Sequence, residues 1–346
     1  MGPKPKGGGG AKPGEEVEGE DPGVLLQNYQ KFCKTIGLSS HPGIAKSLTD
    51  EEKFPIKQII IDDESGPLGP GGTRALMTAV MGGAPGMKGG PYKLLESLRF
   101  WRTNAGDDGV GAIAEVLRLG GAEVKLNYLE LLDNNVGERG CLALGYALAK
   151  GNNVSLLTLN LDYNRDIGSL GVANLTRGMR TNISLRNLSM QYCGISTEAG
   201  AHFAEILSNT KSSLETLNVS GNRLGGLGLN SICEGLHVNL CLTKIAVADN
   251  IIDQSEEDLG ALKTLKDVLL NGTTKLESVD LMYNRIGEVG GNILLPVVEG
   301  DTKNKNISEF LVDMTLPMEL FEKLFKNGGG KKGKKGKGGK KGKKKK

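Results

Sequence analysis

A short pattern of leucines and asparagines recurs along most of this chain and restricts its fold more than any other feature. Residues 276–290 read LESVDLMYNRIGEVG, and residues 126–140 read LNYLELLDNNVGERG. Both fit the template L-x-x-L-x-L-x-x-N-x-I-G, with valine at some apolar positions. The alternating apolar residues predict a short strand that ends just before the asparagine. We therefore expect one supersecondary unit to be repeated along the chain.

Nine copies of the strand pattern align with a period close to 29 residues. Between copies, apolar residues recur at helical spacing, as in GERGCLALGYALAKG at residues 137–151. Each unit is predicted to be a strand followed by a helix, and neither element buries its apolar side without the adjacent unit. We expect an α/β solenoid with parallel strands on its concave face and helices on its convex face. The copies begin at Ile56, Leu95, Leu126, Leu156, Leu185, Leu214, Leu242, Leu276 and Ile307.

The repeat resembles that of leucine-rich-repeat proteins of the ribonuclease-inhibitor-like class, over residues 56–327, which include a C-terminal cap expected to end in a short helix. This resemblance implies a horseshoe of about nine repeats. An extended concave surface of this kind suits protein partners better than a small-molecule substrate. We therefore predict a binding protein that is not an enzyme and has no cofactor.

The asparagine of the template is interpreted as structural. The backbone leaves the sheet at this position, and an amide side chain can donate to and accept from the backbone of its own turn and the next. Cysteine is the usual substitute in this class of repeat. The predicted ladder consists of Asn134, Asn164, Cys193, Asn222, Asn250 and Asn284.

Three segments outside the repeat and one loop within it divide the chain. Residues 1–23 are rich in Gly, Pro and charge and are expected to form a tail, whereas residues 24–55 show helical spacing and are predicted to cap the first repeat. Residues 82–91, GGAPGMKGGP, are predicted to be a flexible loop. After residue 327 the chain is only Gly and Lys, so residues 328–346 form a second predicted tail.

The second tail dominates the charge balance. It holds eleven lysines and no acid, so the rest of the chain carries −8 although the formal net charge is +3. We predict that the tail tethers an acidic body to a polyanion, either the acidic tails of tubulin or nucleic acid; sequence does not separate the two. Its lysines are Lys331, Lys332, Lys334, Lys335, Lys337, Lys340, Lys341, Lys343, Lys344, Lys345 and Lys346.

Catalytic and metal-binding patterns are missing from the sequence. Neither a phosphate-binding loop nor a nucleophile elbow occurs, and the three histidines have no Cys or acid at ligand spacing. The five cysteines show no paired spacing, and the N-terminus lacks the apolar segment of a signal peptide. We expect a reduced, intracellular protein, without a membrane span.

The residues expected to point toward the concave face are mostly acidic or aromatic. Beside the candidates below, Asp62, Asp63, Asp280, Asp313 and Arg99 occupy these columns. The single Trp and three tyrosines are typical anchors of protein interfaces. The predicted protein-binding residues are Trp101, Arg102, Glu130, Asp133, Asp162, Tyr163, Gln191, Tyr192, Asp249, Met282 and Tyr283.

The predicted cap contains Tyr29-x-x-x-Cys33, followed by Gly37-Leu38 and His41-Pro42. This order resembles the entry segment of ribonuclease-inhibitor-like proteins of cilia and flagella, including relatives of dynein-regulatory-complex and radial-spoke subunits. The resemblance implies a structural subunit of an axonemal complex in the cytoskeleton. Two alternatives remain: a Ran-type GTPase-activating protein or ribonuclease-inhibitor-like regulator, and a nucleic-acid- or ribosome-associated protein.

Overall fold

The computed structural model describes residues 19–121, 123–271 and 274–328, and within them the strands form one open sheet in chain order, β1 to β10. Strands β1 to β9 are parallel, and β10 runs antiparallel to β9. The strands are β1 (Gln58–Ile61), β2 (Ser97–Trp101), β3 (Tyr128–Leu132), β4 (Thr158–Asn160), β5 (Asn187–Ser189), β6 (Thr216–Asn218), β7 (Lys244–Ala246), β8 (Ser278–Asp280), β9 (Glu309–Leu311) and β10 (Lys326–Asn327).

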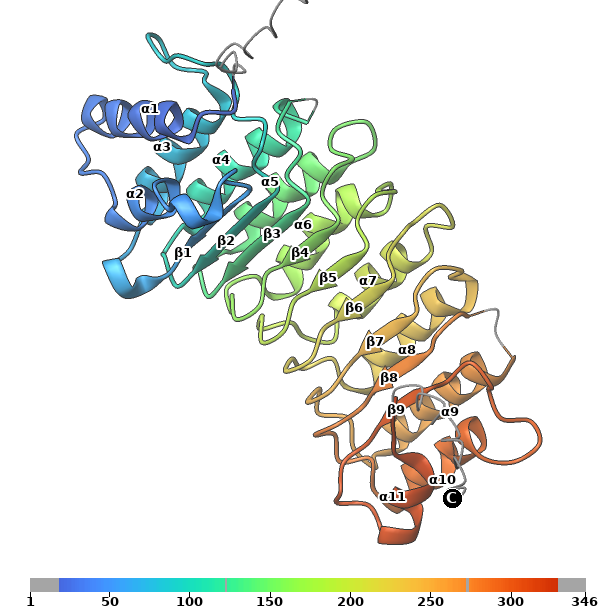
Figure 1. Ribbon diagram of the computed structural model, residues 1–346. Coiled ribbons are helices and arrows are strands. Elements are labelled where there is room, and N and C mark those ends of the chain that lie inside the picture. The colour runs from blue at the N-terminus through green and yellow to red at the C-terminus, as the bar shows by residue number, and fades with distance from the viewer. Residues whose placement is uncertain (1–18, 122, 272–273, 329–346) are drawn as a thin grey trace, which may run out of the picture.

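Helices follow the strands one by one and pack on their neighbours along the solenoid (Figure 1). The spacing between packed helices is about twice that between paired strands, so the helical layer is the outer, convex one. This α/β solenoid confirms the predicted fold class. The helices are α1 (Pro22–Thr35), α2 (Pro42–Leu48), α3 (Gly69–Met81), α4 (Gly106–Leu119), α5 (Glu138–Leu148), α6 (Gly168–Met179), α7 (Ala199–Leu207), α8 (Gly225–Val238), α9 (Glu256–Asn271), α10 (Gly287–Val298) and α11 (Met318–Leu324).

The core lies between the two layers and is built from the same repeat positions in every unit. In β3, Leu129 and Leu131 are fully buried, while Glu130 between them faces the concave side. Leu129 pairs in register with Leu98 and Leu159, so equivalent core residues stack from strand to strand. The period of two in the sequence therefore fixes which side chains can reach a partner on the concave face.

The first end of the solenoid is covered by α1 and α2. Leu25, Tyr29 and Ile44 are buried there, and the Tyr29 hydroxyl accepts a hydrogen bond from the backbone N–H of His41 at 3.1 Å. Residues 82–91 form a loop, but they are attached to α1. The Asn28 amide donates to the carbonyl of Lys88 at 2.9 Å and accepts from its N–H at 3.2 Å. Hydrogen bonds to α1 thus hold a segment that its glycines suggested would have no fixed position.

The other end closes with α11, a short helix that the sequence indicated, and with the short strand β10, which was not predicted. A strand of two residues carries no alternating pattern to detect. Lys326 pairs with Phe310, and its ammonium group donates to the carbonyl of Val298 at 3.1 Å. The antiparallel β10 covers the edge of the sheet that β9 would otherwise expose.

Candidate protein-binding surface

The asparagine ladder forms the floor of the turns that follow the strands. Asn134 donates to the carbonyls of Phe100 and Leu132 at 2.7 and 2.9 Å, and its own N–H donates to the side-chain oxygen of Asn164 at 2.8 Å. All six predicted members are buried. Each therefore joins the turn of its own repeat to that of a neighbour, and none presents its side chain to a partner.

One further residue and one further row of residues share this structural role and were not predicted. Thr103 is the rung before Asn134 and donates to its side-chain oxygen at 2.7 Å. A second row lies at the opposite ends of the strands and consists of Asn153, Asn182 and Asn239. The side-chain amide of each donates to a backbone carbonyl near the end of the helix in the preceding repeat. The side-chain oxygen of each accepts two backbone N–H groups of its own turn. The tetrapeptides NVSL, NISL and NLCL were the signal for this row.

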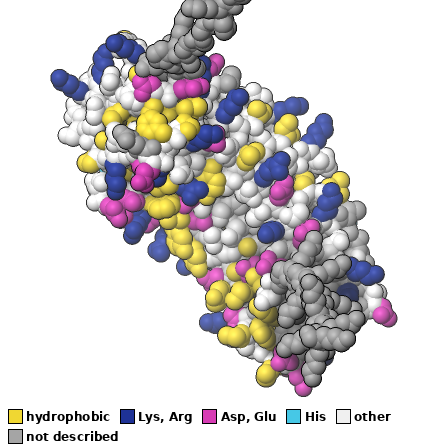
Figure 2. All heavy atoms as spheres, in the orientation of Figure 1, with side chains coloured by type: hydrophobic (Ala, Val, Ile, Leu, Met, Phe, Trp, Pro, Cys, Tyr) yellow, Lys and Arg dark blue, Asp and Glu magenta, His cyan; other side chains and the backbone are white. Residues whose placement is uncertain are grey.

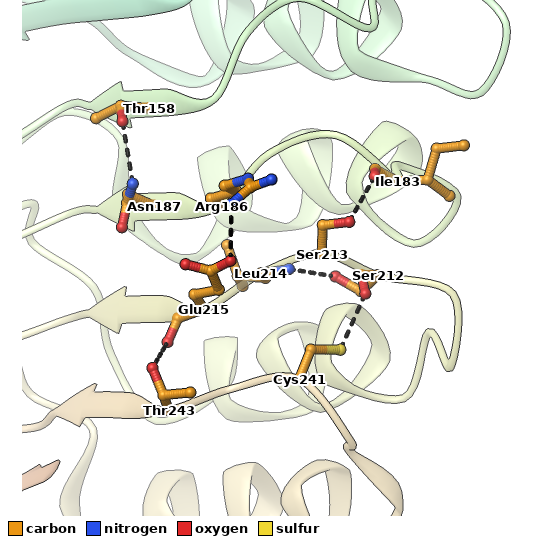
Figure 3. Close-up of polar contacts among 10 residues, drawn as sticks. All are labelled: Thr158, Ile183, Arg186, Asn187, Ser212, Ser213, Leu214, Glu215, Cys241 and Thr243. Carbon is orange, nitrogen blue, oxygen red and sulfur yellow. Dashed lines mark hydrogen bonds and ion pairs between the residues drawn. The ribbon is translucent and has the colours of Figure 1, made fainter. Parts of the chain in front are cut away.

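Other contacts join the repeats at this second edge (Figure 3). Arg186 and Glu215 form an ion pair at 3.1 Å between neighbouring units, and the Cys241 thiol donates to the carbonyl of Ser212 at 2.9 Å. Thr243 donates to the carbonyl of Glu215 at 3.1 Å. In the middle of the solenoid, the side chains at the N-terminal ends of the strands are therefore engaged in contacts between repeats.

The residue just before each ladder position adopts a left-handed backbone. At this step φ is 54° for Arg102, 52° for Asp133, 64° for Tyr163, 52° for Tyr192, 50° for Asp249 and 59° for Tyr283. Gly221 completes the column with φ of 71°. Because a side chain in this conformation costs about 1 kcal/mol or more relative to glycine, tyrosine here is not the choice that backbone stability alone favours.

This turn column projects its side chains outward. Tyr163, Tyr192 and Tyr283 are 48%, 37% and 67% exposed, and Asp133 and Asp249 are exposed as well. The rings of Tyr163 and Tyr192 stack with centroids 5.1 Å apart and an interplanar angle of 15°. Hydrophobic side chains also gather in a band along one edge of the molecule in Figure 2. The tyrosines form an apolar surface that no described residue covers.

Gly221 leaves space for the stacked pair. A Cβ atom at this position would lie 2.4 Å from two carbons of the Tyr192 ring, so only glycine allows the ring to lie across the turn of the next repeat. Burial raises the pKa of Tyr192, and the nearby Asp249 carboxylate raises it further. The phenol is therefore neutral at physiological pH and presents a donor beside an acid.

At the β2–β3 end, the predicted residues form an internal network. The Trp101 indole N–H donates to Oε1 of Glu130 at 2.7 Å, and the Tyr128 hydroxyl donates to Oε2 at 2.9 Å. Glu130 is 9% exposed. Next to this network, Arg102 and Asp63 form an exposed ion pair at 3.3 Å. The structure thus makes Glu130 a support for Trp101, whereas Trp101 and Arg102 remain partly or fully accessible.

Asp162 is also a support. It is buried, Oδ1 accepts from the Ser189 hydroxyl and from the N–H of Gln191, and Oδ2 accepts from the Gln191 side-chain amide. Gln191 is half-buried by the same contacts. Met282 is half-buried, and its N–H donates to Asp280 at 2.9 Å. Asp162 and Gln191 therefore join neighbouring repeats beside the turn column, and all three predicted residues are less accessible than its tyrosines.

The remaining acids of the predicted columns act locally. Asp62 accepts from the N–H of Glu64, and Asp313 accepts from the N–H of Thr315. Burial raises the pKa of Asp280, and the neighbouring Glu309 carboxylate adds to the effect. The eleven lysines of residues 331–346 lie outside the described residues.

The described residues contain no group of three or more His, Cys, Asp and Glu side chains able to hold a metal ion, and none of their helices is long and apolar enough to cross a membrane. Cys141, Cys193 and Cys233 are buried, and burial raises the pKa of each thiol, to about 12 for Cys193 and Cys233. Such thiols remain protonated and are poor nucleophiles.

Comparison with known proteins agrees with the repeat geometry. A family model described as Leucine Rich repeat matches residues 210–233 and 273–291. The matched segments are leucine-rich repeats, and the same strand-and-helix unit recurs along the solenoid. This chain is 29% identical over 147 residues to NACHT, LRR and PYD domains-containing protein 13 of Homo sapiens. The matched segment covers 42% of this chain and 14% of that protein.

Ribonuclease inhibitor is a further relative. The Mus musculus protein is 27% identical over 197 residues, or 56% of this chain and 41% of its own length, and the Sus scrofa protein is 30% identical over 168 residues, or 48% and 35%. This leucine-rich-repeat chain therefore spans less than half the length of each of these relatives. Among solved structures, an internalin from Listeria monocytogenes aligns over 88% of this chain and 93% of its own, with 15% identity and a TM-score of 0.32.

Proposed function

We propose that this chain is a protein-binding scaffold whose main contact surface is the turn column, Arg102, Asp133, Tyr163, Tyr192, Asp249 and Tyr283, together with Trp101. The observation that carries the proposal is the placement of three exposed tyrosines at left-handed positions where glycine would be less strained. Tyrosine supplies a large, rigid and amphipathic contact area, which is characteristic of interface anchors.

The chemistry of the column favours a particular kind of partner segment. In the turn column Asp133 precedes Tyr163 and Tyr192, and Asp249 lies between Tyr192 and Tyr283. The chain without its lysine tail carries −8. A segment that combines Lys or Arg with apolar side chains would meet carboxylates and aromatic faces together. The name ribonuclease inhibitor indicates that one group of relatives acts on another protein, which supports a regulator as a second form of the same binding function.

The contact surface can be tested with a matched pair of variants. Replacement of Tyr163 and Tyr192 by Ala should remove at least one protein that wild type captures from a lysate of its source cells. Tyr146→Ala removes an equally exposed tyrosine, 54% accessible, from α5 on the convex face and should leave capture unchanged. If the double variant folds and captures the same proteins as wild type, while Tyr146→Ala loses one, the interface lies on the helices.

The axonemal role is also a proposal. It is supported by the order of Tyr29, Cys33 and His41, whose positions in α1 and before α2 form the cap described above. A tagged full-length chain in ciliated cells should localise along the axoneme. Nucleolar or diffuse localisation would contradict this role and would leave the scaffold proposal unaffected.

The lysine tail is proposed to strengthen binding to a polyanion. Lysine spaced by glycine provides charge without stacking aromatic residues or an apolar helix face, so its contribution should fall as salt rises. Deletion of residues 331–346 should lower co-sedimentation with microtubules at low salt and flatten the salt dependence. Equal sedimentation of both proteins would contradict the tether, and a loss seen with RNA but not with microtubules would identify nucleic acid as the polyanion.

A further inference from the structure

A hollow of about 450 Å³ opens where β1, β2 and β3 begin. These three strands form the end of the sheet nearest α2 (Figure 1). Its lining includes Lys53, Lys57, Ser97, Arg99 and Tyr128. Ser97 and Tyr128 are register partners on adjacent strands, and Arg99 follows two residues after Ser97 on the same face. The sheet therefore places hydroxyl and guanidinium groups side by side around one space.

The wall of the hollow includes two residues that each have a buried polar atom without a hydrogen-bond partner. Among the described residues, the buried side-chain nitrogen and oxygen atoms without a hydrogen-bond partner are Ser97 Oγ and Arg99 Nε. Both residues line this hollow. An unpaired buried donor costs about 1–3 kcal/mol, and more when the group is charged. Two such groups on one strand provide hydrogen-bonding capacity that no described residue uses.

The position of Arg99 explains why its charge is available. Arg99 is the register partner of Glu130, but the described residues offer it no ion pair. Glu130 already accepts from Trp101 and Tyr128, and the Arg99 guanidinium instead lies over the Tyr128 ring, 4.4 Å from its centroid. The network that orients Trp101 thus occupies the acid opposite Arg99, and Arg99 lines the hollow.

The remaining charges leave the hollow net positive. Lys57 pairs with Glu96 at 2.8 Å, and Lys53 pairs with Asp50 at 2.8 Å. Both are exposed pairs, which contribute little and can exchange partners. The Arg99 charge has no carboxylate of its own in the lining, because Glu96 is the single acid there and it is paired.

We propose that this hollow is an oxyanion-binding site in which Arg99 and Ser97 donate to a carboxylate or a phosphate monoester, with Lys57 and Lys53 at its rim. Guanidinium and hydroxyl donors suit the oxygens of either group. The site lies where β1, β2 and β3 begin, and the turn column lies at the opposite ends of the strands. One lining residue, Tyr128, shares the Glu130 carboxylate with Trp101. Anion binding is nevertheless measured separately from protein capture, so either proposal can fail without the other.

Calorimetric titration of the full chain with inorganic phosphate and with acetate tests the site directly. Wild type should bind at least one of them. Arg99→Gln should weaken binding tenfold or more, because it removes a charge-assisted bond, and Ser97→Ala about three- to tenfold. Arg186→Gln removes an exposed arginine from the same edge of the sheet and should bind like wild type.

The two anions distinguish the possible sources. Phosphate that binds more tightly than acetate at pH 7.5, with the difference shrinking at pH 5.5 as phosphate loses its second charge, assigns a phosphate monoester. The opposite order assigns a carboxylate. If Arg99→Gln does not fold, Lys57→Gln, an exposed substitution, should still weaken binding. No heat with either anion, or equal binding by wild type and a folded Arg99→Gln, would overturn the site.

Discussion

The indole nitrogen of Trp101 lies 2.7 Å from Oε1 of Glu130 on the adjacent strand, and the second oxygen of that carboxylate accepts from Tyr128. One buried acid therefore determines the orientation of two aromatic side chains. The concave face near β2 and β3 depends on Glu130 for its shape, although Glu130 itself is almost inaccessible.

This relationship predicts the effect of Glu130→Ala. The substitution leaves the Trp101 N–H and the Tyr128 hydroxyl without their acceptor, so the free energy of unfolding should fall by about 1–3 kcal/mol. Trp101 fluorescence should shift, since it is the only tryptophan of the chain. Asp133→Ala removes an exposed acid of the following turn. It should change the free energy of unfolding by no more than about 0.5 kcal/mol and should leave the Trp101 fluorescence unchanged. A stable Glu130→Ala with unchanged fluorescence would disprove the support role.

The ladder predicts a graded series at Asn222. Its amide donates to the carbonyls of Met190 and Val219, and its oxygen accepts the N–H groups of Cys193 and Ile195. Asn222→Ala should lower the free energy of unfolding by about 1–3 kcal/mol, measured by denaturant titration. Asn222→Cys should cost less, because Cys193 fills the equivalent position in the preceding repeat. Asn306→Ala, at an exposed loop asparagine, is the control, and equal effects at both sites would contradict the ladder assignment.

Cys241 predicts a site-selective reaction. It is half-buried, and the other four cysteines are buried. Burial raises the pKa of each of those four thiols, so their thiolate fraction is small. Iodoacetamide at pH 8 should alkylate Cys241 first in the native protein, as read by peptide mass spectrometry, while protein unfolded in guanidinium should be labelled at all five sites. Early labelling of Cys193 in native protein would contradict its place in the ladder.

Much of this architecture was predictable because its determinants are periodic. Leu129, Leu131 and Asn134 occur at fixed steps, and a repeated unit multiplies a weak local signal. The row of Asn153, Asn182 and Asn239 had an equally regular signal just before the strands. Its role could have been predicted from the same backbone argument that identified the first ladder.

The surface was less predictable because exposure depends on neighbours far apart in the sequence. Asp162 and Tyr163 are adjacent, but Ser189 and Gln191 of the next repeat bury the acid, while the tyrosine has a left-handed backbone and faces solvent. The members of the turn column were predicted from their places after the strands, but tyrosine does not signal a positive φ, so their left-handed backbone was not. The unpaired donors Ser97 and Arg99 likewise become apparent only when three strands are assembled.

Asp280 predicts how the stability of the C-terminal repeats depends on pH. Burial, reinforced by the negative charge of Glu309, raises the pKa of this carboxyl in the folded state. A raised folded pKa means that the stabilising contribution of the protonated acid is fully present below the unfolded pKa, near 3.8, and is lost as pH rises through the folded value.

Asp280→Asn keeps an oxygen that can accept from the Met282 N–H and removes the buried charge. The variant should therefore melt at a higher temperature than wild type at pH 7, and the difference should shrink toward pH 3.5. Asp313→Asn, at a half-buried carboxylate that also accepts a backbone N–H, provides the comparison and should show no such gain. If Asp280→Asn is less stable than wild type at pH 7, the carboxylate stabilises its surroundings by more than its burial costs, and the predicted sign is wrong.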